Sequence, residues 1–246
     1  MNYSRRSYRQ QLSPRGMDSF TVTVKETDLW ITVDKNAIVP GLPEKVEQYI
    51  WNERRLLEKY MEKDPLFMRT MEPYLVSKEA PAIAVDMVRA GNLAGVGPMA
   101  AVAGAFAEYV GRWLLKFSSQ VIVENGGDIF LRCDEPLNVG VFAGESTFSQ
   151  KLALRIEPSG SSSGICTSSG SVGPSYSQGN ADAAVILAPS AILADAVATA
   201  AANKVHSHAD LNAAIDFAKN IPGVKGALLI LGEKLAAWGE IQLMEI

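Results

Sequence analysis

Apolar and polar residues alternate near the start of the chain and then repeat with a helical period. Between residues 20 and 24 every second residue is apolar, and a second apolar run follows at 29–33, which predicts a β-hairpin. From 42 to 64 apolar residues recur every three or four positions among Glu, Lys and Arg, the pattern of an amphipathic helix with one solvated face. Prolines interrupt the segment 67–87, so we expect only short helical pieces there.

An almost uniformly apolar stretch runs from 98 to 117 and predicts a buried central helix, with Pro98 in its first turn. Glu108 and Arg112 are four residues apart, so they can pair on one face of this helix. Small side chains at helical spacing would let a neighbouring sheet or backbone approach the helix closely. These small residues are Ala100, Gly104, Ala107 and Gly111.

The sequence VIVENGGDI predicts a second hairpin with a polar tip. Its first apolar run ends in Glu124 and Asn125. The chain turns at Gly126 and Gly127, because glycine takes the positive φ that a tight hairpin needs, and Asp128 opens the next apolar run. Two carboxylates and an amide at this tip either position a ligand or cap their own turn.

Further apolar runs predict strands in the second half of the chain. They lie at 137–142, 152–156, 183–187, 227–231 and 239–243. Together with the helices, these elements predict an α+β fold, in which a mixed or mostly antiparallel sheet packs against the buried central helix and flanking helices.

The first 17 residues contain four Arg and no acidic residue, so we read them as a basic N-terminal arm, followed by a single domain at 18–246. The net charge of the 246-residue chain is −4, and 48% of its residues are apolar. This composition predicts a folded protein without a nucleic-acid partner. Charged residues interrupt every apolar stretch before it reaches the length of a membrane span, so we expect no membrane insertion and a cytoplasmic location. The sequence leaves the oligomeric state open, a homo-oligomer included.

Residues 159–179 contain nine Ser and five Gly. By composition the segment is a flexible linker. A loop rich in hydroxyls and free amides is equally suited to cradle a phosphate or nucleotide, and the two readings stay level.

The segment after Ser190 predicts a helix with an acidic residue on an alanine-lined face, and Ser190 suits its N-cap. Asp195 and Thr199 are four residues apart, so their side chains share this face. A buried, unpaired carboxylate is costly, and a hard cation such as Mg²⁺ would offset that cost with carboxylate, hydroxyl and carbonyl ligands. The simpler alternative is an Asp that faces solvent.

Two further residue types have structural explanations. His206 and His208 are the only histidines, and Ser207 with Asp210 forms the pattern of a capping box between them and the next helix. Cys133 and Cys166 lack metal-ligand spacing and are read as buried thiols.

A dinucleotide-binding pattern also occurs at the start of the central helix. Gly95, Gly97 and Ala100 spell G-x-G-x-x-A, and Glu124 follows at the end of an apolar run. That fingerprint requires a buried strand leading into its first glycine, and no such strand is visible before Gly95. Free amides at this helix N-terminus could still hold an anion.

Three segments, AGVGPMAAVAGAFAEYVG, VENGGDIF and LADAVATA, resemble the UPF0280 proteins, a group similar to the ApbE flavin transferases. The likeness to ApbE rests on the GGD turn at 126–128, the TSSG run at 167–170 and the ADA-x-AT helix at 194–199. This resemblance implies a Mg²⁺-dependent enzyme that binds FAD and transfers its FMN half to a Thr or Ser of an acceptor protein, with release of AMP.

The resemblance also implies roles for individual residues. The metal ligands would be Asp195, Thr199 and the backbone carbonyl of Ala100. The flavin nucleotide would be bound by two groups of residues. These are Glu124, Asn125, Gly126, Gly127 and Asp128 at the hairpin tip, and Thr167, Ser168, Ser169 and Gly170 in the TSSG run.

The sequence departs from ApbE at two places. The family's His-x-x-Asp-Pro-x-Thr-Gly motif is replaced by SVGPSYSQGN at 171–180, and its Ala-Lys-Gly lysine by Ala101 or Val102. Three hypotheses follow: an ApbE-like enzyme, a non-catalytic module that binds a flavin or other nucleotide, and an NAD-type Rossmann oxidoreductase.

Overall fold

The fold is described from a computed structural model over residues 16–170 and 179–246. Eight strands form one antiparallel sheet in the order β1-β2-β3-β4-β7-β8-β9-β10, and three form a second in the order β11-β6-β5. The strands are β1 (Met17–Val24), β2 (Thr27–Asp34), β3 (Val121–Asn125), β4 (Asp128–Arg132), β5 (Leu137–Gly140), β6 (Leu152–Ile156), β7 (Ser163–Ser168), β8 (Ala183–Ala188), β9 (Gly226–Leu231), β10 (Lys234–Gly239) and β11 (Gln242–Glu245). The helices are α1 (Leu42–Lys63), α2 (Pro65–Arg69), α3 (Ala82–Ala94), α4 (Val102–Leu114), α5 (Ala191–Ala202) and α6 (Leu211–Lys219), with short 3-10 turns η2 (Lys35–Ala37), η3 (Pro98–Ala101) and η4 (His208–Asp210).

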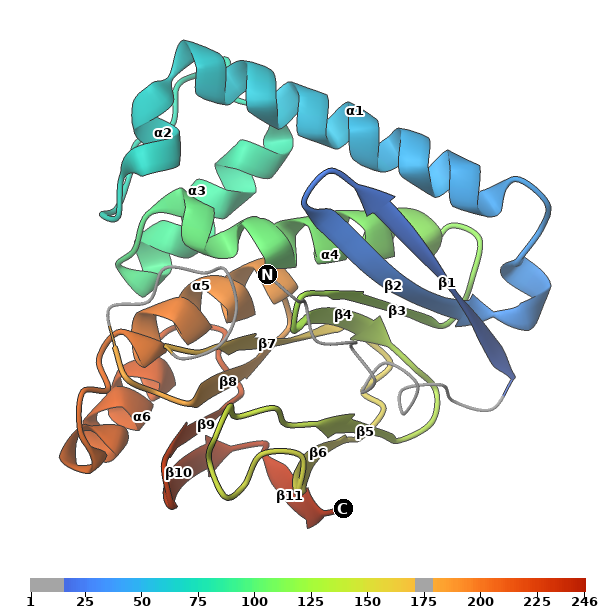
Figure 1. Cartoon of the computed structure of the whole chain (residues 1–246). Coiled ribbons are helices and arrows are strands. Elements are labelled where there is room, and N and C mark those ends of the chain that lie inside the picture. The colour runs from blue at the N-terminus through green and yellow to red at the C-terminus, as the bar shows by residue number, and fades with distance from the viewer. Residues whose placement is uncertain (1–15, 171–178) are drawn as a thin grey trace.

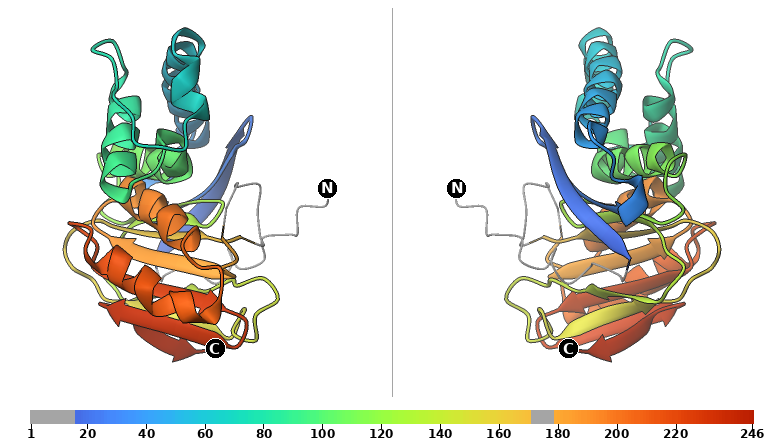
Figure 2. Two further views of the ribbon diagram at one scale, coloured as in Figure 1. Left: turned by 90° about the vertical axis from the view of Figure 1, so that its left-hand side faces the viewer. Right: turned by 90° about the vertical axis from the view of Figure 1, so that its right-hand side faces the viewer.

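The large sheet separates two hydrophobic cores. Helices α4, α5 and α6 pack on one face, and the small sheet covers the other (Figure 1). Side chains alternate between the two faces of a strand, so Val121 and Val123 of β3 enter the helix-side core, while Ile122 enters the core under the small sheet. Helices α1 and α3 form an outer layer above α4 (Figure 2). The predicted α+β fold with an antiparallel sheet is confirmed.

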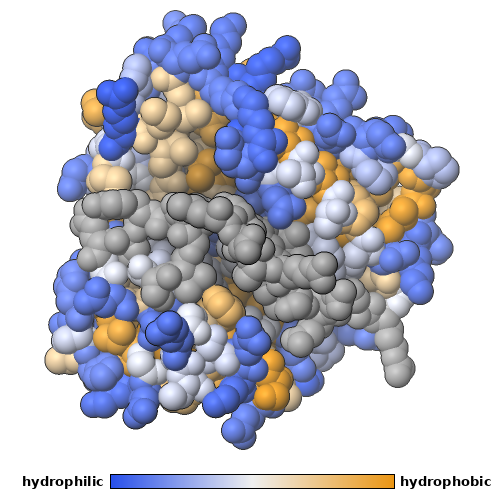
Figure 3. Space-filling view, in the orientation of Figure 1, coloured by the Kyte–Doolittle hydropathy of each residue, from blue (hydrophilic) through white to orange (hydrophobic). Residues whose placement is uncertain are grey.

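Several local predictions are confirmed as well. The hairpin β1–β2, the amphipathic helix α1 and the hairpin β3–β4 lie where the patterns place them. The Ser190 hydroxyl caps α5, and the Ser207–Asp210 capping box is present at η4. Residues that face solvent are mostly hydrophilic on the side of the molecule shown in Figure 3, and most of the apolar residues are buried.

The central helix is shorter than predicted and begins with a 3-10 turn. Pro98–Ala101 forms η3. The α-helix α4 begins after it, at Val102, with Ala101 as its N-cap, and ends at Leu114. Phe117, placed inside the predicted helix, is 56% exposed beyond its end. The small residues act as expected, because a Cβ on Gly111 would lie 2.1 Å from the ring of Phe130 in the sheet below.

The Gly/Ser segment is not a linker over its first half. Residues 163–168 form β7, which lies inside the large sheet between β4 and β8. Gly164 is required there because α5 begins against it: a Cβ would lie 2.3 Å from the Ala191 backbone. Residues 171–178, the rest of the segment, lie outside the described part of the chain, as do residues 1–15 of the predicted arm.

The prediction of a last strand at 239–243 is wrong. It spans the junction between β10, which pairs with β9, and β11, which pairs with β6 in the small sheet. Gly239 has a φ of +83° and lets the chain change sheets there.

A Rossmann unit is excluded by the element before Gly95. Helix α3 leads into this glycine, which ends the helix with a φ of +75°, and all strand pairs of the described sheets are antiparallel. Gly97 is explained by packing, since a Cβ there would lie 1.9 Å from the Thr70 carbonyl oxygen.

In the described residues no single helix is both long and apolar enough to cross a membrane. Helix α3 and the segment Pro98–Leu114 together have the length and apolar composition of a span, but they are bent by 103° relative to each other.

Candidate functional site

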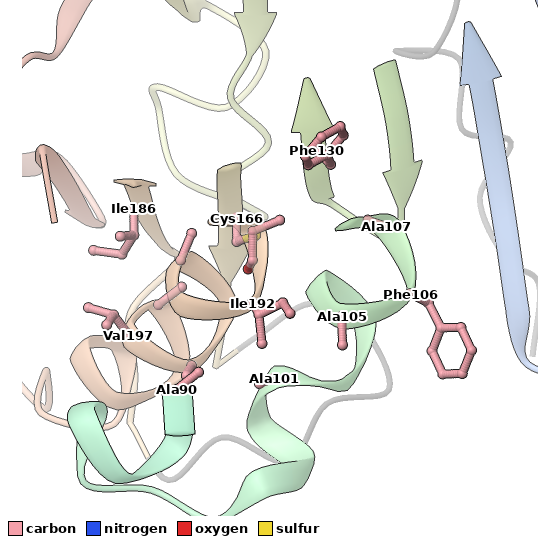
Figure 4. Close-up of a cluster of buried hydrophobic side chains, with 14 of the residues drawn as sticks. Ala90, Ala101, Ala105, Phe106, Ala107, Phe130, Cys166, Ile186, Ile192 and Val197 are labelled. Carbon is pink, nitrogen blue, oxygen red and sulfur yellow. The ribbon is translucent and has the colours of Figure 1, made fainter. Parts of the chain in front are cut away.

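Helices α4 and α5 meet at a point where only glycine fits. A Cβ on Gly104 would lie 2.4 Å from the Ala191 carbonyl oxygen and 2.8 Å from the Cβ of Asp195. Around this contact the interface is built from small residues: Figure 4 shows Ala101 and Ala105 beside Ile192 of α5, whereas Phe106 points away from them. This close approach brings the first turn of α4 against the face of α5 that carries Asp195.

Asp195 is buried in this interface and accepts a hydrogen bond from the Gly104 backbone N–H at 2.8 Å. Burial raises the pKa of its carboxyl to about 7, and the backbone N–H groups of Gly104 and Ala103 partly offset that rise. The Gly104 N–H in the first turn of α4, which the sequence suggested could hold an anion, thus binds an acidic side chain of the protein itself. The solvent-facing reading of Asp195 is wrong, because the residue is only 8% exposed.

The tip of the β3–β4 hairpin lies against the same end of α4. Gly126 and Gly127 both take positive φ, +69° and +109°. The carboxylate of Glu124 accepts a hydrogen bond from the Gly127 backbone N–H at 2.9 Å, and its side chain is fully buried. Asn125 donates from Nδ2 to the Ala103 carbonyl oxygen at 3.0 Å. These contacts give Glu124 and Asn125 structural roles in the turn and its attachment to α4.

Asp128 occupies a different environment. It is buried, and its Oδ1 has no hydrogen-bond partner among the described residues. Burial, followed by the nearby charges of Asp195 and Glu124, holds the pKa of its carboxyl well above the usual range, and the Cys166 thiol and the Thr167 backbone N–H offset this only in part. Two buried carboxyl groups from different elements thus interact electrostatically, and one oxygen of Asp128 has no hydrogen-bond partner among the described residues.

The TSSG run lies beside this pair because of the strand register. Ile129 pairs with Ile165, so the following residues of β7 run alongside the hairpin tip. The Thr167 carbonyl oxygen is 3.8 Å from the position that a Cβ on Gly127 would take. Ser168 and Ser169 are buried next to it, and the Gly170 backbone N–H donates to the Ala181 carbonyl oxygen at 2.8 Å. The structure therefore brings the GGD and TSSG segments together.

The remaining predicted ligands lie at the same interface. Thr199 is half-buried one turn after Asp195, and η3, which contains Ala100, packs against α5. Their roles as metal ligands stay predictions.

A cation suits this arrangement of donors. The buried Oδ1 of Asp128 has no hydrogen-bond partner among the described residues, and a cation would favour the ionised form of this carboxyl, which burial and the nearby Asp195 disfavour. Within 16–170 and 179–246 there is no group of three or more His, Cys, Asp or Glu side chains able to hold a metal. A bound ion would thus need hydroxyl and carbonyl oxygens in addition to these carboxylates, which is the preference of Mg²⁺.

Two contacts at the site were not foreseen from the sequence. Cys166, expected only to be buried, also donates to the Ala191 carbonyl oxygen at 3.2 Å. Its thiol contacts Asp128 as well, so Cys166 is part of the site. Glu108 forms the predicted pair with Arg112, and in addition accepts hydrogen bonds from the Ser190 hydroxyl at 2.7 Å and the Ile192 backbone N–H at 3.1 Å. It thereby fixes the start of α5 on α4. No local signal marks either contact, because the partners are far apart in sequence.

Comparison with known proteins gives consistent results. A model of the family described as AbpE bacteria matches residues 9–242. A UPF0280 protein of Methanosarcina barkeri is 42% identical over 220 residues, 89% of this chain and 85% of that protein, and one of Methanocella arvoryzae is 45% identical over 193 residues, 78% of each.

Two solved structures share the fold. The flavin transferase ApbE from Vibrio cholerae has a TM-score of 0.58 at 15% identity, with 92% of this chain and 97% of that chain covered. The ApbE protein from Thermotoga maritima has a TM-score of 0.58 at 14% identity, with 89% and 96% covered.

Proposed function

Because the chain belongs to the AbpE bacteria family, alongside the UPF0280 proteins, we propose that it is a Mg²⁺-dependent enzyme that binds FAD and transfers the FMN half to a hydroxyl of an acceptor protein. The observation that supports this best is the unpaired Oδ1 of Asp128 beside the buried Asp195 carboxylate. Burying two acids is costly, and a bound cation would offset that cost.

Asp195, Thr199 and the Ala100 carbonyl would hold the metal, with Asp128 facing the same position. When bound, Mg²⁺ neutralises charge that develops on a pyrophosphate and orients the leaving AMP. The rigid approach of α5 to Gly104 fixes the Asp195 carboxylate, since the Gly104 N–H holds one of its oxygens at 2.8 Å. Positioning of this kind is what an in-line phosphoryl transfer requires from the protein.

The flavin nucleotide would lie along the hairpin tip and the TSSG run. Gly126 and Gly127 carry no side chain, so a phosphate can approach the backbone of the turn. The hydroxyls and N–H groups of Thr167 to Gly170 supply donors for phosphate oxygens. Glu124 and Asn125 would act indirectly, by holding the tip against α4.

A second function, nucleotide binding without catalysis, is favoured by one feature of the sequence. The segment at 171–180 reads SVGPSYSQGN and contains no His or Asp to take a proton from an acceptor hydroxyl. A module of this kind would keep the cation and nucleotide positions and lack turnover.

One experiment separates the two functions. The full-length chain is incubated with FAD, MgCl₂ and a Ser/Thr-containing acceptor, and AMP, free FMN and protein-bound flavin are measured by chromatography, with FAD binding measured by calorimetry. The enzymatic function is supported if AMP is released by the unmodified protein and by Asp216→Asn but not by Asp195→Asn. Asp216 is an exposed acid on α6 and serves as the control. Saturable FAD binding without AMP release supports the binding module. Neither binding nor cleavage would contradict both.

A further inference from the structure

A cavity open to solvent lies away from the acidic site, between α1 and the outer side of α4. Its volume is about 260 Å³, and it is lined by Tyr49 of α1 and by Tyr109, Arg112, Trp113 and Lys116 from α4 and the turn after it. The four α4-side residues recur at spacings of three and four, so they share one face of the helix. Gly111, which touches Phe130 of the sheet, marks the opposite face. Arg112 lies eight residues beyond Gly104, about 12 Å along the helix axis.

Aromatic rings form one wall of this cavity. Tyr49 stacks on Trp113 with ring centroids 5.3 Å apart and an interplanar angle of 18°, and Phe117 tilts against Trp113 at 4.9 Å. The Tyr109 hydroxyl donates to Asp86 of α3 at 2.9 Å, which fixes its ring. The wall is therefore fixed by contacts among three helices and gives the cavity an aromatic surface.

The tyrosines contribute no negative charge. Burial, with the nearby Glu53 carboxylate, raises the pKa of Tyr49 to about 12. Burial and the hydrogen bond to Asp86 raise the pKa of Tyr109 further. Both hydroxyls stay protonated at neutral pH, and each is directed at an acid of α1 or α3.

Two cationic side chains line the same cavity. The Arg112 side chain pairs with the buried Glu108 and is 57% exposed. Lys116 is exposed one turn further on, and within the described chain it forms no ion pair. Two carboxylates near the cavity are engaged by the tyrosines, Glu53 of α1 by Tyr49 and Asp86 of α3 by Tyr109. An anionic group is thus favoured beside Arg112 and Lys116.

The cavity volume is sufficient for one ring with a small acid group. A cavity of about 150 Å³ holds a benzene molecule, so 260 Å³ leaves space for an acid group beside the ring. We propose that this cavity binds a small molecule consisting of a single aromatic ring that carries a phosphate or carboxylate. The ring would lie against Trp113 and the tyrosines, and its acid group between Arg112 and Lys116.

The test uses phenyl phosphate and benzoate as probes, with inorganic phosphate and phenol as the acid and ring alone, on the full-length chain by calorimetry. We expect saturable binding of phenyl phosphate or benzoate at least tenfold tighter than either half. Lys116→Gln should weaken that binding at least fivefold. Lys219→Gln, which removes a lysine 5.8 Å from the Trp238 ring and outside the set of residues that line this cavity, should leave it unchanged.

Trp113→Leu tests the ring wall, with circular dichroism to confirm that the variant folds. The proposal is overturned if neither probe binds saturably, if the isolated acid or ring binds as tightly as the whole probe, or if Lys116→Gln binds the probe like the unmodified protein. Because FAD is not a probe here, these outcomes are independent of the flavin-transfer experiment.

Discussion

The Asp195 carboxylate accepts a hydrogen bond from the Gly104 N–H at 2.8 Å, across an interface so close that a Cβ on Gly104 would lie 2.4 Å from the Ala191 carbonyl oxygen. Three features of this interface therefore depend on one another. They are the glycine on α4, the aspartate on α5 and the short distance between the two helices. Burial raises the pKa of this carboxyl to about 7, and the Gly104 N–H offsets that rise only in part.

Gly104→Ala should be strongly destabilising, because the added methyl group meets backbone and not a movable side chain. We expect the free energy of unfolding, measured by urea denaturation, to fall by about 2–3 kcal/mol. Gly160→Ala provides a comparison, since that glycine has open space around it and a φ of +69°, so only backbone strain of about 1–2 kcal/mol applies. Equal losses in the two variants would show that the helices do not approach as closely as described.

Asp195→Asn should stabilise the metal-free protein at pH 8. The folded pKa of about 7 lies above the ordinary value of 3.8, so the stability this group contributes is complete below pH 3.8 and is lost as pH rises through 7. An amide keeps the acceptor oxygen for Gly104 and removes the buried charge, which should add about 1–3 kcal/mol at pH 8. The gain should shrink towards pH 6. Urea unfolding at both pH values measures it, and a loss of stability at pH 8 would contradict the assignment.

Mg²⁺ should raise the melting temperature of the protein more at pH 8 than at pH 6, because a proton and a cation compete for the same buried carboxylates. Asp128→Asn should reduce this shift to near zero, since the proposal places the ion beside the unpaired Oδ1 of Asp128. Differential scanning fluorimetry with 10-fold steps of MgCl₂ measures the shift, and Asp216→Asn on α6 is the matched control. A full Mg²⁺ response in Asp128→Asn would place the cation elsewhere.

The sequence predicts part of this arrangement. That Asp195 and Thr199 share one face follows from the period of one helix, and their roles as metal ligands stay predictions. The electrostatic coupling of Asp128 to Asp195 joins residues 67 positions apart in sequence, and it depends on how β4, β7 and α5 pack together.

The errors in the fold have similar causes. The strand at Ser163–Ser168 is hidden by Ser and Gly, which are rare in strands in general but are needed here where α5 approaches the sheet. The final apolar run reads as one strand, because the change of sheet at Gly239 depends on pairing with β6 rather than on local composition.

Glu124→Ala should separate the structural role of the hairpin tip from its proposed binding role. The carboxylate is fully buried and accepts the Gly127 N–H at 2.9 Å, so its removal leaves a cavity and an unsatisfied donor in the turn. We expect the free energy of unfolding to fall by about 2–3 kcal/mol. The Mg²⁺-induced rise in melting temperature should persist, because the carboxylate serves its own turn and the unpaired oxygen belongs to Asp128. Asp128→Asn should show the reverse pattern, a lost Mg²⁺ response without a comparable loss of stability. If Glu124→Ala instead keeps its stability and loses the Mg²⁺ response, Glu124 is a ligand of the ion and the division of roles at the tip is wrong.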